Sequence, residues 1–252
     1  MSELFNVRAL KAKKTSARCK PEQNFLRDEI GRTLENRLSL LGLQKDLKNT
    51  LYLGEHFNQN NSYKYYQPLF DQCPLPFSDK TFDLIIDHMT LHWISDLPFY
   101  LKEVQRIMAP QGIYLAGFLA EKTLQELRHS LLELDLEVFQ GAKARVSPLL
   151  KTQSVPDLFK HLGFQTCIVD HEEIKVVYKD VYHMIQDLRS MGETNSLFES
   201  DPNQKILYHR SYFQKLNDLM SRNFPGPKGT GIQVTFDLTY VCASPRIMSK
   251  AS

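Results

Sequence analysis

Cysteine is scarce in this chain, with four in 252 residues and no Cys-x-x-Cys pair. The four are Cys19, Cys73, Cys167 and Cys242. Such a scatter excludes a disulfide framework and a cysteine-ligated zinc site, and it is typical of reduced thiols. Long apolar runs are also missing, since no window approaches the ~18 apolar residues that span a bilayer. We therefore expect a cytoplasmic protein without a membrane span.

Charge of one sign is not in excess either, because the formal net charge is only +2. A balance this small gives no reason to expect a nucleic-acid or membrane partner. The basic residues do cluster over residues 8–20 (RALKAKKTSARCK). That run is either a solvated helix face or a surface for an acidic partner. No histidine lies near other potential ligands, so no metal site is expected.

The apolar pattern that is present indicates an α/β protein. Residues 25–43 carry an apolar stripe at helical spacing, and residues 51–53 form a short strand. FDLIIDH (82–88) is a buried-strand run, residues 96–110 form a helix begun by a capping aspartate, and residues 112–119 form the next strand. Strand, helix and strand in this order predict a βαβ unit of a parallel sheet.

Downstream segments continue the alternation of helices and strands. Helices are expected over 121–139, 154–164 and 206–224, a helix followed by a loop over 181–197, and two strands joined by a polar turn over 165–178. A closing strand alternates apolar residues on one face, namely Val234, Phe236, Leu238 and Tyr240.

The segment LYLGEHFNQ (51–59) ends a strand with a single glycine, Gly54. A strand feeding a cofactor-binding loop often ends in glycine, because glycine allows the backbone to approach a ligand closely. Here Glu55 and His56 follow directly, so the loop is crowded by side chains. The aromatic segment 62–70 comes next and is strand-like.

Two long segments carry a family resemblance. They read DQCPLPFSDKTFDLIIDHMTLHWISDLPFYLKEVQRIMAPQGIYLAGF (71–118) and DLRSMGETNSL (187–197). They resemble class I S-adenosylmethionine-dependent methyltransferases. Within that family, they resemble the malonyl-carrier-protein methyltransferases and the methyltransferase-like assembly factors of respiratory complex I. The resemblance covers nearly the whole chain.

The resemblance implies a fold and a division of the chain. The expected fold is a Rossmann-like α/β fold with a mostly parallel twisted sheet, helices on both faces and antiparallel C-terminal strands. The expected division is an N-terminal helical segment, 1–48, and a methyltransferase-like domain, 49–252, with helical insertions around 121–163 and 181–224.

It also implies site residues, each with a structural alternative. In the family, an acidic residue just before LPF accepts a hydrogen bond from adenine, and this position is Asp71, followed by Gln72. Asp87 and His88 leave the next strand where such proteins line the S-adenosylmethionine pocket. The alternatives are a turn-former before Pro74 for Asp71, and a helix-capping or loop pair for Asp87 and His88.

The segment 187–197 supplies the expected contacts with a substrate or partner. The candidates are Arg189, Glu193 and Asn195. Their alternative role is a helix-terminating loop in which Gly192 is the cap.

The glycine loop departs from the family pattern D-x-G-x-G-x-G. Tyr52 stands where the acidic residue is expected, and only Gly54 of the three glycines remains. A path of helix, strand, helix and strand needs roughly 45 residues, yet only residues 55–74 separate Gly54 from Leu75. One helix–strand unit is therefore missing. Segment 62–70 is left either to pair antiparallel to 51–53 or to sit displaced at the sheet edge.

Two functions follow from these observations. The first is an S-adenosylmethionine-dependent methyltransferase acting on a carrier-bound acid or a protein. The second is a catalytically inactive, protein-binding assembly factor that has lost the methyl donor. One assembly factor of this subgroup is an arginine hydroxylase, so fold alone does not fix the reaction.

Overall fold

The computed structural model describes residues 4–18, 24–41, 49–54, 63–68, 74–141, 144–197 and 210–246. The chain divides into two compact units, each assembled from separate segments. One unit comprises residues 25–120, 150–172 and 238–252 and is called the sheet unit here; the other comprises 1–24, 121–149 and 173–237 and is called the helical unit.

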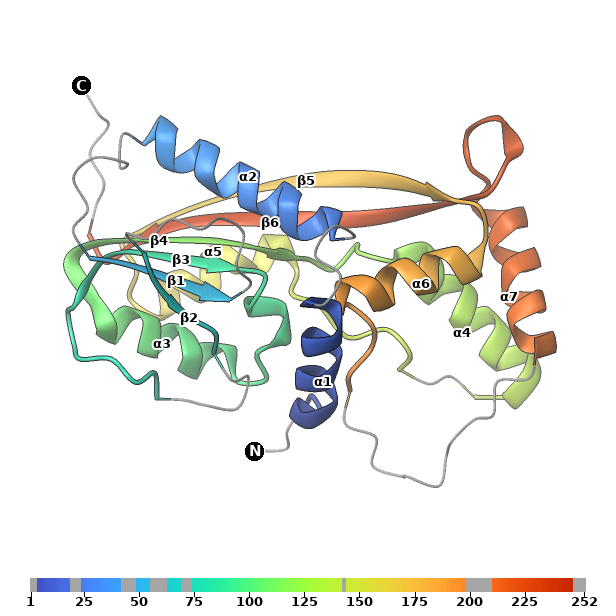
Figure 1. Cartoon of the computed structure of the whole chain (residues 1–252), viewed down its shortest axis with the longest axis horizontal. Coiled ribbons are helices and arrows are strands. Elements are labelled where there is room, and N and C mark those ends of the chain that lie inside the picture. The colour runs from blue at the N-terminus through green and yellow to red at the C-terminus, as the bar shows by residue number, and fades with distance from the viewer. Residues whose placement is uncertain are drawn as a thin grey trace. The chain divides into compact units, whose positions relative to one another are not determined.

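The sheet unit contains a mixed sheet with the order β2-β1-β3-β4-β6-β5 (Figure 1). Its strands are β1 (Thr50–Gly54), β2 (Lys64–Tyr66), β3 (Phe82–His88) and β4 (Met108–Leu119), with β5 (Thr166–Tyr178) and β6 (Ile232–Ser244), each of which continues into the helical unit. The first four strands are parallel to their neighbours, and β6 runs antiparallel to β4. The expected Rossmann-like arrangement with antiparallel C-terminal strands is confirmed.

Helices cover both faces of this sheet (Figure 1). They are α2 (Phe25–Leu40) on one face, and α3 (Leu97–Ile107) and α5 (Val155–His161) on the other. The expected capping aspartate is present, since Asp96 accepts a hydrogen bond from the Phe99 backbone N–H at 3.1 Å and so satisfies a free donor of the first turn of α3.

The helical unit holds the remaining helices, α1 (Val7–Arg18), α4 (Gln125–Phe139), α6 (Val181–Met191) and α7 (Arg210–Asn223). In α6, the aspartate Asp180 caps the first turn and Gly192 ends the helix in a left-handed conformation. No helix within the described ranges is long and apolar enough to cross a membrane.

Between β1 and β3, the described residues include a single short strand, β2, as the predicted loss of a helix–strand unit requires. Of the two alternatives for segment 62–70, antiparallel pairing is wrong, because β2 pairs parallel to β1, whereas its position at the sheet edge agrees with the second alternative. Only three residues of each strand are paired. To begin β2 parallel to β1, the chain must therefore travel back along β1 by only about 10 Å between Gly54 and Lys64. The nine intervening residues reach up to roughly 30 Å.

Two further expectations need correction. Residues 166–178 form one strand, not two, because β5 lies at the sheet edge, where its charged middle remains exposed. Pro110 does not end α3, which stops at Ile107. Instead the proline lies in β4, where the register jumps from Phe82↔Met108 to Leu84↔Ile113. An irregular register accommodates a residue that has no N–H to donate.

Helix α2 packs directly on β4 at Gly117. A Cβ built on this glycine would lie 2.5 Å from Cγ2 of Ile30 and 3.4 Å from Cδ1 of Leu34. Both neighbours are buried α2 side chains, and Ile30 is stiff at χ1. The close contact between helix and sheet therefore depends on the missing side chain.

We predict that Gly117→Ala lowers the free energy of unfolding by roughly 1–3 kcal/mol, because α2 must move to relieve the overlap. Urea denaturation followed by circular dichroism measures the change. Gly141→Ala is the matched control, since its Cβ would meet only the Phe139 carbonyl, at 3.9 Å. Equal effects for the two variants would show that α2 is not held against β4.

Candidate functional site

The carboxyl ends of β1 and β3 meet at one edge of the parallel sheet. The register places Leu53 opposite Asp87 and Gly54 opposite His88. Three of the predicted site residues, Gly54, Asp87 and His88, are therefore brought together. Asp71 and Gln72 lie outside the described residues, and Arg189, Glu193 and Asn195 belong to the helical unit.

The space beside Gly54 is filled by the chain itself. Gly54 adopts φ 96°, and a Cβ there would overlap the carbonyl oxygen of His88 and Oγ1 of Thr90. The glycine thus allows β1 to approach the end of β3, and this approach explains why it is required.

A hydrogen-bonded chain occupies the α2 side of this edge. Tyr52 Oη lies 2.7 Å from His88 Nδ1, and His88 Nε2 lies 2.9 Å from the carbonyl oxygen of Arg27 in the first turn of α2. Because a carbonyl only accepts, Nε2 donates to it, and in the singly protonated ring Nδ1 accepts from the Tyr52 hydroxyl. Both ring nitrogens of His88 are therefore engaged within the chain.

Aromatic rings surround Tyr52. Tyr65 is 5.2 Å away and Tyr63 is 6.3 Å away between ring centroids, and the His88 ring meets Tyr52 edge-on. Burial raises the pKa of Tyr52 well above its ordinary value, so the phenol stays protonated and uncharged.

These residues do not fit the methionine end of S-adenosylmethionine. The family pattern places a carboxylate at this strand end to meet the amino group of the ligand, whereas this chain places the neutral Tyr52 phenol there. Its hydroxyl is already donated to His88. The carboxylate of Glu35 on α2 lies near enough to help raise the pKa of Tyr52, but it belongs to the helix and not to this strand end.

Asp87 points to the opposite face of the sheet, toward α3. Its Oδ2 accepts hydrogen bonds from Tyr100 at 2.7 Å and Tyr114 at 2.9 Å. The side chain is fully buried, and its Oδ1 has no hydrogen-bond partner. Burial, opposed by these hydrogen bonds, raises the pKa of Asp87 to about 6.

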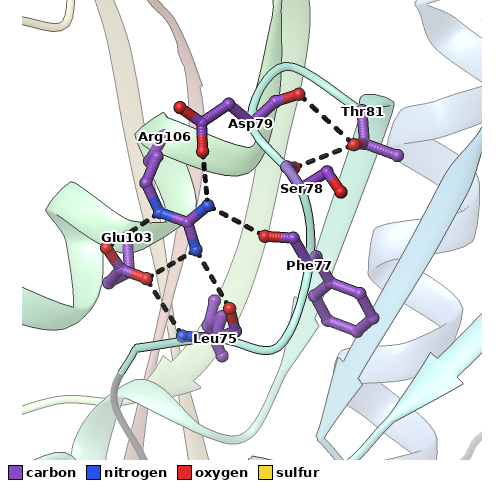
Figure 2. Close-up of polar contacts among 7 residues, drawn as sticks. All are labelled: Leu75, Phe77, Ser78, Asp79, Thr81, Glu103 and Arg106. Atoms are coloured by element: carbon purple, nitrogen blue, oxygen red, sulfur yellow. Dashed lines mark hydrogen bonds and ion pairs between the residues drawn. The ribbon is translucent and has the colours of Figure 1, made fainter.

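The turn that follows the predicted adenine-binding position is held by α3 (Figure 2). Arg106 donates to the carbonyl oxygens of Leu75 at 2.9 Å and Phe77 at 2.8 Å, and it pairs with Asp79 and Glu103. Glu103 in turn accepts from the Leu75 N–H at 3.0 Å, and its pKa is lowered by the hydrogen bond from Arg106. We call this arrangement the Arg106 clamp.

Neither residue of the clamp was identified from the sequence. The available signal was their three-residue spacing on a predicted helix, which is typical of a Glu–Arg pair. That spacing occurs on many exposed helices, and it does not reveal that the arginine reaches the backbone of a turn about 30 residues earlier.

The predicted partner residues of segment 187–197 lie against α1. Glu193 forms a buried ion pair with Lys14, and Asn195 accepts from Ser147 at 3.1 Å. Lys13 donates to the Asn195 carbonyl and, at 3.1 Å, to the Ser196 hydroxyl. Two lysines of the early basic run are thus used internally, and only Arg189 is exposed among the three candidates.

Gly192 has the capping role that was the structural alternative. Its φ is 72°, and its Cβ position lies 3.1 Å from the Cβ of Ala17 and 3.2 Å from Cδ of Lys14. The described residues contain no group of three or more histidine, cysteine, aspartate or glutamate side chains suited to a metal ion.

We predict that Tyr52→Phe destabilises the fold by about 1–3 kcal/mol, because it leaves the buried Nδ1 of His88 without a donor. Urea denaturation measures the effect. Tyr182→Phe removes the hydroxyl of an exposed tyrosine and is expected to change stability by no more than about 0.5 kcal/mol. Unchanged stability of Tyr52→Phe would contradict the Tyr52–His88 hydrogen bond.

Lys14→Met and Glu193→Gln are each expected to cost about 3–5 kcal/mol, because each leaves one buried charge without its partner. The double variant should cost less than the sum of the two. Glu137→Gln, which breaks an exposed pair with Lys215, is the control and should cost at most about 1 kcal/mol. If the Glu193→Gln variant is as stable as the wild-type protein, Glu193 is again a candidate for contact with a partner.

Comparisons with known proteins agree with this fold. A family profile described as a methyltransferase domain matches residues 46–116. The mitochondrial arginine-hydroxylase NDUFAF5 of Rattus norvegicus is 30% identical over 237 residues, which cover 82% of this chain and 67% of that protein. The malonyl-[acyl-carrier protein] O-methyltransferase of Halorhodospira halophila is 31% identical over 126 residues, 50% of this chain and 41% of that protein.

A solved structure supports the same assignment at the level of the fold. The YcgJ protein of Bacillus subtilis aligns with a TM-score of 0.51 at 12% identity, over 85% of this chain and 100% of that one. Sequence and fold together show that the chain belongs to the class I S-adenosylmethionine-dependent methyltransferase family.

Proposed function

We propose that this chain acts as a protein-binding member of its family, of the assembly-factor kind, and that methyl transfer has been lost. The observation that carries the proposal is the Tyr52–His88–Arg27 chain of hydrogen bonds at the carboxyl ends of β1 and β3. In the family pattern, a carboxylate at this position binds the amino group of S-adenosylmethionine. In this chain, neutral groups whose hydrogen bonds are already made within the protein stand in its place. The partner is a protein or a carrier protein.

The internal hydrogen bonds at this edge of the sheet lower the affinity for S-adenosylmethionine in two ways. A ligand must first break the Tyr52–His88 hydrogen bond, and its amino group then meets a neutral phenol at position 52 in place of a carboxylate. Each loss is on the order of 1–3 kcal/mol, so together they lower affinity by a factor of roughly 30 to 20,000. The related proteins carry different named activities, so family membership by itself does not argue that this chain catalyses methyl transfer.

A second function is methyl transfer to a carrier-bound acid or a protein, and one observation favours it. The Arg106 clamp fixes the Leu75–Phe77 turn with hydrogen bonds to two backbone carbonyls and one N–H. A turn held so firmly next to the predicted adenine-binding position favours a retained nucleoside side of the pocket.

Isothermal titration of the full chain with S-adenosylmethionine distinguishes the two functions. We expect no saturable heat up to millimolar ligand, because a neutral phenol stands at position 52 where the family pattern has a carboxylate for the amino group of the ligand. The Halorhodospira halophila methyltransferase, titrated in the same buffer, is the positive control. Stoichiometric binding with a Kd below about 100 µM would favour methyl transfer over the proposal.

The partner side of the proposal has its own measurement. A holo-acyl carrier protein is titrated into the chain by sedimentation velocity, in the presence and absence of S-adenosylmethionine. Complex formation that does not depend on the donor is the expected result. Complex formation only with the donor present would contradict a donor-independent binding role.

A further inference from the structure

Asp87 lies in apolar surroundings at the centre of the sheet unit. Its strand neighbours in register are Leu53 on β1 and Ala116 on β4. The hydrophobic core on this face includes Leu53, Leu91 and Leu101. A carboxylate is thus inserted into a core of largely apolar groups, where the neighbouring polar groups are two phenols and the buried Thr90.

The two carboxylate oxygens of Asp87 differ in their hydrogen bonds. Both phenol donors, Tyr100 from α3 and Tyr114 from β4, converge on Oδ2. Thr90 also faces the carboxylate and lowers its pKa, but its hydroxyl donates to the His88 carbonyl at 3.4 Å, and Oδ1 has no hydrogen bond of ordinary geometry. No lysine or arginine of the described residues is its hydrogen-bond or ion-pair partner. A buried charge with one unsolvated oxygen is costly, whereas a neutral carboxylic acid carries its proton on that oxygen.

Among the described residues, the titratable groups around Asp87 are few, and no lysine or arginine is among them. On its own face they are the phenols of Tyr100 and Tyr114. Across the sheet they are Tyr52 and His88, which are hydrogen-bonded to each other. Burial raises the pKa of Tyr114 well above its ordinary value, so this donor stays protonated throughout the physiological range.

The chain leaves Asp87 through a strained turn. Met89 is buried and has φ 58°, a left-handed conformation that is unfavourable for a residue with a side chain. Its N–H donates to the Gly117 carbonyl at 2.8 Å, and the short 3₁₀ turn Leu91–Trp93 follows. The contacts of Asp87 with Tyr100 and Tyr114 therefore tie this turn to α3 and β4.

We propose that Asp87 is a proton-binding site that controls how firmly the turn after β3 is held. With the proton bound, the carboxyl group is neutral and the turn is closed on α3 and β4. When the proton leaves, one net charge remains in the core, and the strained turn is the part that opens to water. The site thereby gains access to solvent as pH rises, independently of whether S-adenosylmethionine binds.

The sign of the pH dependence follows from linkage. The pKa of Asp87 is raised from an ordinary 3.8 to about 6, so the folded chain binds this proton more tightly than the unfolded chain. The stabilisation is complete below about pH 3.8 and is lost as pH rises to about 6. A difference of about two units corresponds to roughly 100-fold in the unfolding equilibrium constant.

The test compares the full chain with Asp87→Asn by urea denaturation between pH 4.5 and pH 8. Asparagine keeps the acceptor for the two phenols and never ionises. At pH 7.5 the variant is expected to have an unfolding constant roughly 100-fold smaller than wild type, with the gap closing toward pH 4.5. Asp83→Asn, on the same strand but outside the core, is the matched control and should follow wild type at every pH.

Hydrogen–deuterium exchange of the wild-type peptide 82–93 gives a readout that does not depend on the variant folding. After correction for intrinsic chemical rates, protection is expected to fall at least tenfold between pH 5 and pH 7.5. Parallel pH slopes for wild type and Asp87→Asn, or unchanged protection of this peptide, would each overturn the proposal. Parallel slopes would mean that Oδ1 is solvated or paired in solution.

Discussion

The structure depends above all on the parallel pairing of β1 with β3. That register brings Gly54 beside His88 and Leu53 beside Asp87, so everything at this edge follows from it. The pairing is close because Gly54 has no side chain where the His88 carbonyl and Thr90 already lie. A glycine of the kind that usually admits a ligand therefore serves packing within the chain itself.

The two faces of β3 at this edge have different chemistry. On the α2 side, Tyr52 and His88 satisfy each other, and the Arg27 carbonyl completes the arrangement without any charge. On the α3 side, Asp87 is an acid among apolar neighbours and phenols. The Arg106 clamp, in contrast, is held by opposite charges that remain partly exposed. A family scaffold has thus kept its frame while the polar groups at the strand ends were exchanged.

Much of the fold was predictable from the sequence because its signals are local. The run Phe82–His88 and the aspartate cap of α3 were predicted from apolar pattern and cap chemistry alone. The direction of β2 was not, because pairing direction depends on how far the chain must return, not on the strand residues. Of the predicted site residues, Gly54, Asp87 and His88 lie at one edge of the sheet, as the rule that parallel strands end at one edge leads one to expect. The Tyr52–His88 bond and the Arg106 clamp join residues far apart in the chain, so no local pattern indicates them.

The Lys14–Glu193 ion pair has a consequence for how this sequence can change. The two residues are 179 positions apart, yet each is almost fully enclosed, with 3% and 2% of its side chain exposed. Losing one removes the ion-pair partner of the other, enclosed charge, whereas exchanging both for apolar side chains of similar volume is far less harmful. The two positions are therefore expected to covary among related sequences. Replacements that preserve stability should change both residues together, one in the N-terminal helix and one at the end of α6.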